Sequence, residues 1–516
     1  MKLQGTCRRF AWRRIRPILR RSAAWCVAAT TALLILLLPG FGCKVGPNYH
    51  TPATSMPANW GEAPAAANGS PASQPTTQPA DLAGWWKTLH DPVLDGLIDE
   101  AIRGNLDLRQ AEARVREARA QRGIVAAAEW PLVDATASYE RERLSRNASV
   151  VGQPVPSSGG YANGGINLYQ AGFDASWEVD VWGQVQREVE AADANVAVAV
   201  EDRRDVLVTL LSEVALNYIE LRSFQRQKLI SQETVDAQHQ TVELTRAQYA
   251  IGTVSDLDVA QAEAQEANFA AQIPVLETVI RQRIHQLGVL IGQQPMVLSQ
   301  LEAQELPVPP TPAEIPLGLP SDLLRQRADV RRAERHLAAT TAEIGVAVAD
   351  LFPQFSLIGS AGLESTKLHN LVKTGSIFWN AGPSMTWTVF DGGAIRSNIK
   401  FTNAVQEEAA AAYDQVVLAA LRDTEDALVA FFKEQAHHKA LADTVEANRR
   451  VLALATDLFK YGRTDFLNVL TAQEALYISQ LALAQSDQAL ATDLVAIYKA
   501  LGGGWESIPL QETASK

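Results

Sequence analysis

Two stretches of the chain have the hydrophobic pattern of very long helices. Between Gly183 and Gly252, and again between Gly393 and Gly462, lie 68 residues without glycine or proline. Both stretches are rich in Ala, Leu, Glu and Gln, and apolar residues recur along the first at helical spacing. At a rise of 1.5 Å per residue, each stretch predicts one helix of about 100 Å. Helices of this length do not fit inside a compact domain.

Each long stretch ends in a glycine-containing turn, after which the helical pattern resumes. The returning stretches span 256–290 and 465–500, so the sequence predicts two helical hairpins at about 184–290 and 394–500. Pro274 lies inside the first returning stretch and predicts a kink there. The second returning stretch has no proline and predicts an uninterrupted helix.

Four shorter stretches alternate between apolar and polar residues with a period of two, the pattern of β-strands. They lie at about 131–141, 168–180, 353–363 and 378–390. Each has about the length that a tilted strand needs to cross a bilayer. Half-buried strands of a soluble sandwich alternate in the same way, and four strands are too few to close a membrane barrel. The sheet is therefore either soluble or completed by other chains, because an open edge in lipid leaves backbone groups unpaired.

The two halves of the chain resemble each other, which indicates a duplicated domain. GTVSDLDVAQAEA near residue 252 matches GRTDFLNVLTAQEA near residue 462 at an offset of 210. Upstream the offset is 222, so the first copy has 12 more residues between its two strands, and an exposed loop is expected there. The loops joining each pair of strands are polar in composition, which fits extracellular loops.

The N-terminus has the layout of a secretory signal. Residues 1–42 contain eight Lys or Arg and no acidic residue. An apolar stretch at 23–38 comes directly after the basic residues. A signal anchor is the alternative. With these eight removed, 38 of the 46 basic residues remain against 58 acidic ones, a net charge of about −20, which argues against nucleic acid as a partner. Cleavage before Cys43 leaves Cys43 as the only thiol, which excludes an intrachain disulfide.

The stretch LPGFGC at 38–43 resembles a bacterial lipobox, although Gly40 stands where such sites usually have leucine. The resemblance implies that Cys43 becomes the first residue and is acylated. No other cofactor is expected. The predicted segments are a signal peptide at 1–42, a lipid-anchored leader with a short helix at 43–104, a first repeat at 105–300, a linker at 301–320, a second repeat at 321–503 and a tail at 504–516.

Several motifs together resemble the TolC-like outer-membrane efflux factor family, in its OprM/NodT-type branch. They are CKVGPNYHTP at 43–52, SWEVDVWGQV at 176–185, GLPSDLLRQRADVRRAE at 318–334, IGVAVADLFPQFSLIG at 344–359, VFDGG at 389–393 and YKALGGGW at 498–505. The resemblance implies a homotrimer in the outer membrane. Each chain would give four strands to one twelve-stranded barrel and its helices to a long periplasmic barrel.

Such proteins are passive exit ducts, and the resemblance implies the same function here. The hairpin tips would dock onto a periplasmic membrane-fusion adaptor, which joins the duct to an inner-membrane RND transporter. A duct for type I secretion is one alternative. A coiled-coil lipoprotein scaffold without a pore is another, which the strand pattern disfavours.

The turns of the two hairpins hold the candidate site. Gly252 and Gly462 are predicted C-caps, and Ser255 and Thr464 are predicted N-caps. Acidic side chains repeated in threefold at the tip would form a ring that favours cations. Asp465 either belongs to such a ring or stabilises the first turn of its helix. Many members of the family carry aspartate where this chain has Thr471, and some where it has Asn468, so the resemblance does not imply an aspartate ring at these two positions. The candidate residues for adaptor docking are Gly252, Ser255, Asp256, Asp258, Gly462, Thr464, Asp465, Asn468 and Thr471.

An enzyme is not expected. The eight histidines are scattered, His437 and His438 are interpreted as a solvated helix face, and no HExxH, GxSxG or P-loop motif is present. No metal site is expected either. Trp177 and Trp387 lie near strand ends and either form an aromatic girdle at the membrane interface or pack in the core.

Overall fold

The computed structural model describes residues 43–54, 56–58, 60–61, 82–143, 165–304, 306–312 and 325–506. The predicted signal peptide, most of the first strand-to-strand loop, the later part of the linker and most of the tail lie outside these residues. The chain divides into two compact units. Unit 1 comprises Met1–Asn48, Ile124–Glu190 and Ala342–Thr402, and unit 2 comprises Tyr49–Gly123, Ala191–Thr341 and Asn403–Lys516. Each unit therefore takes residues from both halves of the sequence.

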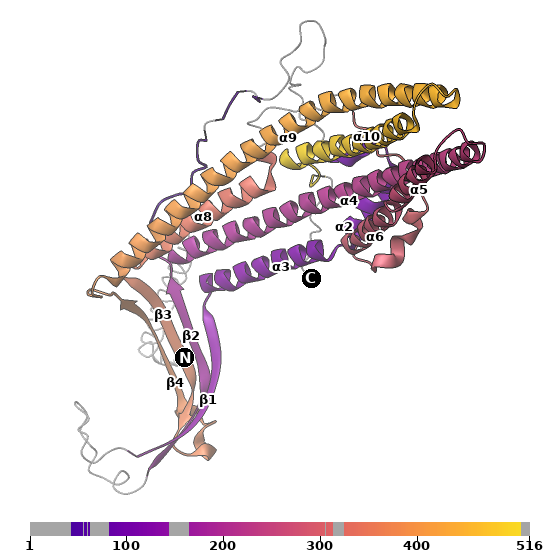
Figure 1. The fold of residues 1–516 in the computed structure, drawn as a ribbon. Coiled ribbons are helices and arrows are strands. Elements are labelled where there is room, and N and C mark those ends of the chain that lie inside the picture. Colours follow the sequence, from indigo (N-terminus) through magenta and orange to yellow (C-terminus); the bar gives the residue numbers. More distant parts are fainter. Residues whose placement is uncertain are drawn as a thin grey trace, which may run out of the picture. The chain divides into compact units, whose positions relative to one another are not determined.

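Unit 1 contains a four-stranded antiparallel sheet in which the strands follow one another in chain order. The strands are β1 (Leu132–Glu142), β2 (Ile166–Val179), β3 (Gln354–Ser365) and β4 (Ile377–Thr386). They lie side by side in Figure 1. The pairing of β2 with β3 joins the two sequence copies within one sheet. Two short 3-10 turns, η4 (Leu368–Asn370) and η5 (Thr374–Ser376), lie between β3 and β4.

The fourth strand is shorter than predicted. It ends at Thr386 rather than near residue 390, so Trp387 and Val389 lie beyond the sheet. Thr386 pairs with Gln354, and the residue before Gln354 is Pro353, which has no amide hydrogen to donate to the ladder. The alternation of polar and apolar residues continues past Thr386, but the hydrogen-bonded partner does not.

The sheet has no core of its own in the described chain. All residues of β1 are exposed, and apolar side chains on the other strands are exposed as well, including Phe173, Ile377, Trp379 and Met385. Among the described residues, β1 and β4 each pair with one strand only, so both are open edges. A soluble sandwich would bury one face of the sheet against a second layer.

Each long glycine-free stretch forms one helix of 67 residues, as predicted. The helices are α2 (Pro92–Gly104), α3 (Leu106–Ala126), α4 (Gln184–Ala250), α5 (Asp256–Ala270), α6 (Ile273–Leu290), α8 (Ala328–Ala349), α9 (Ala394–Lys460) and α10 (Phe466–Ala500), with the 3-10 helices η1 (Trp85–Leu89), η2 (Ala127–Glu129) and η3 (Pro295–Glu302). None of the helices in the described ranges is long and apolar enough to cross a membrane.

The first returning helix is divided into α5 and α6, with Pro274 at the start of α6. Proline fits there because the first turn of a helix leaves its amide groups unpaired in any case. The second returning helix, α10, is continuous over 35 residues. The predicted kink corresponds to an interruption at Ala271 and Gln272, whose backbone angles stay helical, and it is confined to the first copy.

The main core of unit 2 lies where η1, α2, α4, α6, α9 and α10 meet. Its most buried side chains include Trp85, Leu211, Tyr218, Phe431 and Leu494. Buried Asn105 links the start of α3 to the end of α6, because its side-chain amide donates to the carbonyl of Leu290 at 2.9 Å and its side-chain oxygen accepts from the backbone amide of Leu108 at 2.9 Å.

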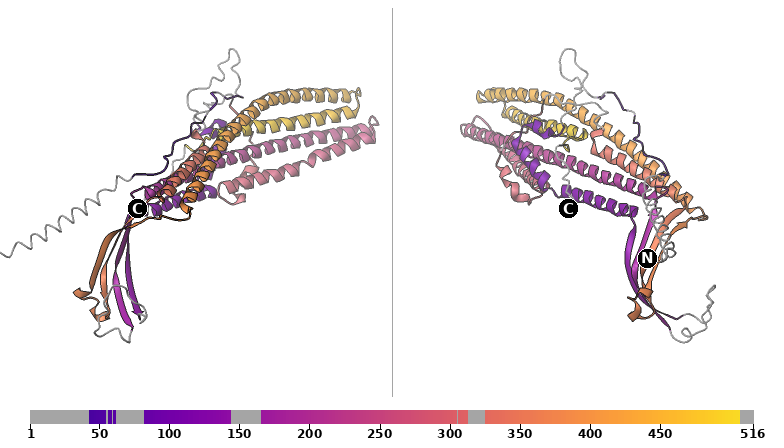
Figure 2. Two further views of the ribbon diagram at one scale, coloured as in Figure 1. Left: turned by 90° about the vertical axis from the view of Figure 1, so that its left-hand side faces the viewer. Right: turned by 180° about the vertical axis from the view of Figure 1, so that it is seen from behind.

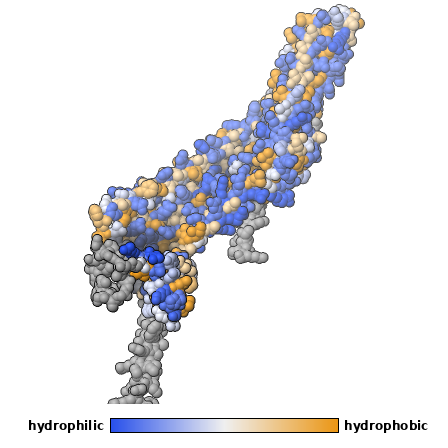
Figure 3. Space-filling model, turned by 90° about the horizontal axis from the view of Figure 1, so that it is seen from below, coloured by the Kyte–Doolittle hydropathy of each residue, from blue (hydrophilic) through white to orange (hydrophobic). Residues whose placement is uncertain are grey.

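Hydrogen bonds within unit 2 hold each hairpin together and also connect one hairpin to the other. On α4, Gln238 donates to the carbonyl of Ala262 on α5, and Ser231 bonds to Tyr477 on α10 at 3.0 Å. Asn448 on α9 donates to the carbonyl of Ala475 on α10. The hairpins are visible as paired helices in Figures 1 and 2. On the face seen in Figure 3, hydrophobic side chains are interspersed with hydrophilic ones along the helices.

Candidate functional site

The two hairpin turns have the same backbone geometry. Gly252 and Gly462 have positive φ values of 75° and 65°, in the left-handed region that favours glycine. In the first turn, the amide of Gly252 donates to Tyr249 and the amide of Thr253 donates to Gln248. The second turn repeats this pattern with the amides of Gly462 and Arg463 donating to Phe459 and Leu458. Both turns are Schellman C-caps, as the sequence predicted for the two glycines.

The helix starts after these turns differ. Ser255 is the N-cap of α5 and forms a capping box with Asp258, whose carboxylate accepts from the Ser255 amide at 2.8 Å. In the second copy the prediction that Thr464 is the N-cap is wrong. Asp465 is the N-cap of α10, and it makes no side-chain capping bond. The Thr464 hydroxyl instead accepts a hydrogen bond from the side-chain amide of Asn468 at 2.8 Å. This bond holds the Thr464 side chain away from the backbone amides of the helix.

An apolar cluster brings the two turns together. It consists of the buried residues Val242, Ala262, Phe459, Phe466 and Val469. The rings of Phe459 and Phe466 are 5.2 Å apart, and Gln473 on α10 donates to the Thr241 hydroxyl on α4 at 3.0 Å. The candidate tip residues of both copies therefore belong to one surface, which we call the tip surface.

Exposed apolar residues occupy equivalent positions in the two turns. Ile251 and Leu257 in the first turn correspond to Tyr461 and Leu467 in the second, at the same offset of 210. Their exposed fractions are 75%, 65%, 80% and 61%. The repeat offset already pairs Leu257 with Leu467, but no docking role was predicted for any of the four residues. Large exposed apolar side chains that cluster in this way indicate a contact surface.

The acidic residues of the tip surface do not form a cluster with one function. Asp258 is half-buried and committed to its capping box, whereas Asp256 and Asp465 are exposed. Asn468 and Thr471 are exposed, and Thr471 donates to the carbonyl of Leu467 at 2.9 Å. Asp256 and Asp465 are thus the carboxylates available for a charged ring.

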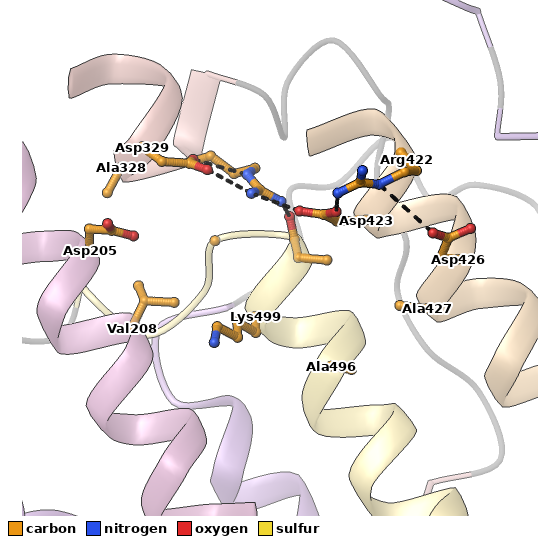
Figure 4. Close-up of a pocket in the computed structure, with 13 residues that line it drawn as sticks. Asp205, Val208, Ala328, Asp329, Arg422, Asp423, Asp426, Ala427, Ala496 and Lys499 are labelled. Atoms are coloured by element: carbon orange, nitrogen blue, oxygen red, sulfur yellow. Dashed lines mark hydrogen bonds and ion pairs between the residues drawn. The ribbon is translucent and has the colours of Figure 1, made fainter. Parts of the chain in front are cut away.

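A cavity of about 640 Å³ lies elsewhere in unit 2, where α4, α9, α10 and the start of α8 meet (Figure 4). Arg327 forms a bidentate pair with Asp329, at 3.0 and 2.7 Å, and donates to the carbonyl of Ala500 at 2.8 Å. Burial alone would raise the pKa of Asp329, but the hydrogen bonds and positive charge of Arg327, together with the Val330 amide and Arg332, lower the pKa overall. Burial raises the pKa of Asp205 on α4, which lines the same cavity.

Two of the motifs noted in the sequence meet at this cavity. Gly502 has φ 75°, and a Cβ on it would lie 2.9 Å from the Cα of Arg327. The RADVRR and YKALGGGW motifs therefore interlock the start of α8 with the end of α10. The charged groups that line the cavity pair mainly with one another, so the arrangement serves packing and offers no activated nucleophile.

The two tryptophans near the strand ends make equivalent contacts. Trp177 donates to the carbonyl of Glu129 at 3.1 Å, and Trp387 donates to the carbonyl of Leu351 at 3.2 Å. Each indole thus donates to a backbone carbonyl that lies just before the start of the neighbouring strand, β1 for Trp177 and β3 for Trp387. Neither side chain is buried. Exposure favours an aromatic girdle over packing in the core. The girdle at the membrane interface stays a prediction.

The histidine pair on α9 is not only a solvated face. His437 is exposed beside Glu434, but half-buried His438 contacts Asp487 on α10 at 2.7 Å. No group of three or more His, Cys, Asp or Glu able to hold a metal ion occurs within the described part of the chain.

Asp493 on α10 is expected to make the stability of unit 2 depend on pH. Burial, followed by the negative charge of Glu434, raises the pKa of Asp493 to about 6 from 3.8. The folded state then holds this proton more tightly than the unfolded state, so stability falls as the pH rises from about 4 to about 6. Asp493→Asn is expected to raise the thermal midpoint by a few degrees at pH 7.5 and to change it little at pH 4. Asp457→Asn, at an exposed position on α9, is the control, and an equal gain at both pH values would contradict this explanation.

The sheet and the paired hairpins define a class of protein: outer-membrane channel proteins that combine strands with long helical hairpins. The model of the outer membrane efflux protein family matches residues 97–293 and 319–503, one match in each sequence copy. The chain belongs to this family.

Relatives along nearly the whole chain agree with this assignment. Nodulation protein T of Rhizobium leguminosarum bv. trifolii is 30% identical over 479 residues, covering 93% of this chain and 98% of that protein. The probable efflux pump outer membrane protein TtgC of Pseudomonas putida is 32% identical over 489 residues, covering 92% and 96%. The structure of the outer-membrane channel OprN is similar with a TM-score of 0.81 and 34% identity, covering 90% of this chain and all of that chain. The protein is an efflux channel component of the outer membrane.

Proposed function

We propose that the chain is one of three identical subunits of a passive exit duct. The observation that carries this proposal is the sheet, whose strand β1 is exposed on both faces and whose two edges are unpaired within the described part of the chain. Such a sheet is stable in lipid only when other chains pair with its edges. Three copies would supply twelve strands, which is within the range of closed outer-membrane barrels. The small molecules that pass through the duct would be selected by the pump, and the chain itself would catalyse no reaction.

The same proposal places an acyl group on Cys43, the exposed residue at the start of the described chain. Two or three acyl chains on one cysteine would hold the N-terminus firmly in outer-membrane lipid. The partners would be a periplasmic membrane-fusion adaptor and, through it, an inner-membrane RND transporter. The tip surface is the proposed docking site for the adaptor, with Ile251, Leu257, Tyr461 and Leu467 as the apolar contacts.

The docking experiment introduces charges into both turns at once. Leu257→Glu combined with Leu467→Glu is expected to reduce efflux at least tenfold, because two carboxylates would have to be desolvated in the contact. Intracellular dye accumulation measures efflux, and the amount of protein in the outer membrane is measured alongside. Val372→Glu is the matched control, since Val372 is 82% exposed in the turn between β3 and β4 and is not a residue of the tip surface. Normal efflux by the double variant at normal amounts would refute the docking site.

Conductance tests the duct itself. Purified protein in planar bilayers is expected to form trimers that conduct ions, and substitution of Asp256 and Asp465 by asparagine is expected to reduce cation preference. Helical oligomers that stay silent would favour a scaffold without a pore. A duct that supports protein secretion but no drug efflux would favour the type I alternative.

A further inference from the structure

The segment that follows Cys43 is fixed to unit 1 by an unusually complete set of contacts. Lys44 forms an ion pair with Glu190 at 2.5 Å, and the amide of Val45 donates to the carbonyl of Trp182 at 3.2 Å. We call residues 44–48 the strap. The strap belongs to the CKVGPNYHTP motif, to which the proposed duct function assigns no role beyond the cysteine.

Arg187, in the first turn of α4, provides most of the contacts with the strap. Its Nε donates to the carbonyl of Val45 at 3.0 Å, and its Nη2 donates to the carbonyl of Gly46 at 3.3 Å and to the Asn48 side chain at 2.9 Å. Its Nη1 donates to Glu190 at 2.9 Å. The side chain of Arg187 is only 1% exposed. A guanidinium buried to this degree is tolerated only when its donors are satisfied.

Burial alone would raise the pKa of Glu190, but the hydrogen bonds and positive charges of Lys44 and Arg187 together lower the pKa overall. Glu190 is thus ionised at neutral pH and bridges the strap to Arg187. Of the four acceptors used by Arg187, three belong to the strap. If the strap left its place, the buried guanidinium would keep only Glu190, which makes seating of the strap energetically favourable.

The fit of the strap depends on two glycines. Gly46 has φ 86°, and a Cβ on it would lie 2.5 Å from the Cα of Gly345 on α8. A Cβ on Gly345 would in turn lie 2.7 Å from Nε of Arg187. Backbone, helix and guanidinium therefore pack in a space that admits no side chain at either position, as expected for a built binding site rather than a loose tail.

We propose that Arg187 is a positioning residue that seats the strap and thereby holds Cys43 at a fixed place on unit 1, next to the β2–α4 junction. The acyl group then enters the lipid leaflet at one point beside the channel wall, instead of trailing on a free tether. The proposal rests on the acylation of Cys43 put forward above, but the seating of the strap can be tested without it.

Trypsin cleavage after Lys44 reports the seating, because a protease needs an extended, unpaired segment. Full-length mature protein in detergent is digested briefly, and mass spectrometry follows the appearance of a new N-terminus at Val45. In the native protein this cut is expected to be slow compared with the cut after exposed Arg463 in the tip surface. Arg187→Gln is expected to accelerate the cut after Lys44 at least tenfold and to leave the cut after Arg463 unchanged.

Arg449→Gln removes an exposed arginine of α9 and is the matched control, expected to change neither cut. If Arg187→Gln does not fold, Asn48→Ala provides a second test, because it removes one acceptor of Arg187 and changes no residue of α4. It is expected to accelerate the cut after Lys44 several-fold. A native protein cut as fast after Lys44 as after Arg463, or variants cut no faster than native, would overturn the proposal. The mass of the released N-terminal peptide reports acylation separately, so an unmodified Cys43 would refute lipidation while the seating result stands.

Discussion

Replacement of Gly292 by valine is expected to destabilise unit 2 by about 3 kcal/mol or more. Gly292 follows α6 with φ 74°, and a Cβ on it would lie 2.0 Å from the carbonyl oxygen of Gly104. The approach is close from both sides, since a Cβ on Gly104 would lie 2.2 Å from the carbonyl oxygen of Ile291. Backbone atoms cannot move aside as side chains do, so α2 and α6 would have to separate. Denaturation of the purified protein measures the loss.

Gly96 provides the control for Gly292. It lies inside α2, and nothing would lie within 4 Å of a Cβ on it. Gly96→Ala is therefore expected to stabilise the protein by up to about 1 kcal/mol, because alanine loses less backbone entropy in a helix than glycine. If both substitutions had the same effect, the close approach of α2 and α6 would not be the reason that position 292 is glycine.

Trp85→Ala is expected to destabilise the same unit by about 3 to 5 kcal/mol. Trp85 is 1% exposed, and its ring stacks on Tyr498 of α10 with centroids 5.2 Å apart. Removal of the indole leaves a cavity where η1, α2 and α10 meet. Thermal and chemical denaturation give the loss. Tyr461→Ala, at a side chain 80% exposed in the tip surface, is the control and should change the free energy of unfolding by less than about 0.5 kcal/mol.

The long helices and the strands follow from local sequence patterns. Glycines bracket α4 and α9, and those glycines adopt the left-handed conformation that no other residue adopts easily, so the bounds of both helices were predictable. The break before Pro274 followed from the chemistry of proline in the same way. These features depend on residues that are close in sequence, which is why a single sequence is sufficient to predict them.

The errors lie where distant residues decide. The end of β4 depends on Pro353, which is 33 residues before Thr386 in the sequence, and the alternation of β4 contains no sign of it. Thr464 and Asp465 are both good N-cap residues, and the bond from Asn468 decides between them. The strap and Arg187 are 139 residues or more apart, so their contact was visible only in the structure. Leu257 and Leu467 were missed for a different reason, since exposure is not a property of the repeat.

The sheet of unit 1 has an even number of strands, and this parity governs how copies can join. Because successive neighbours alternate in direction, β1 and β4 run opposite ways. Identical chains can then be placed edge to edge around a ring with every seam antiparallel, like the pairings inside each chain. A chain with three strands would place two parallel strands at each seam. A single strand pair already has this even parity, so the duplication that doubled the pair kept every seam antiparallel.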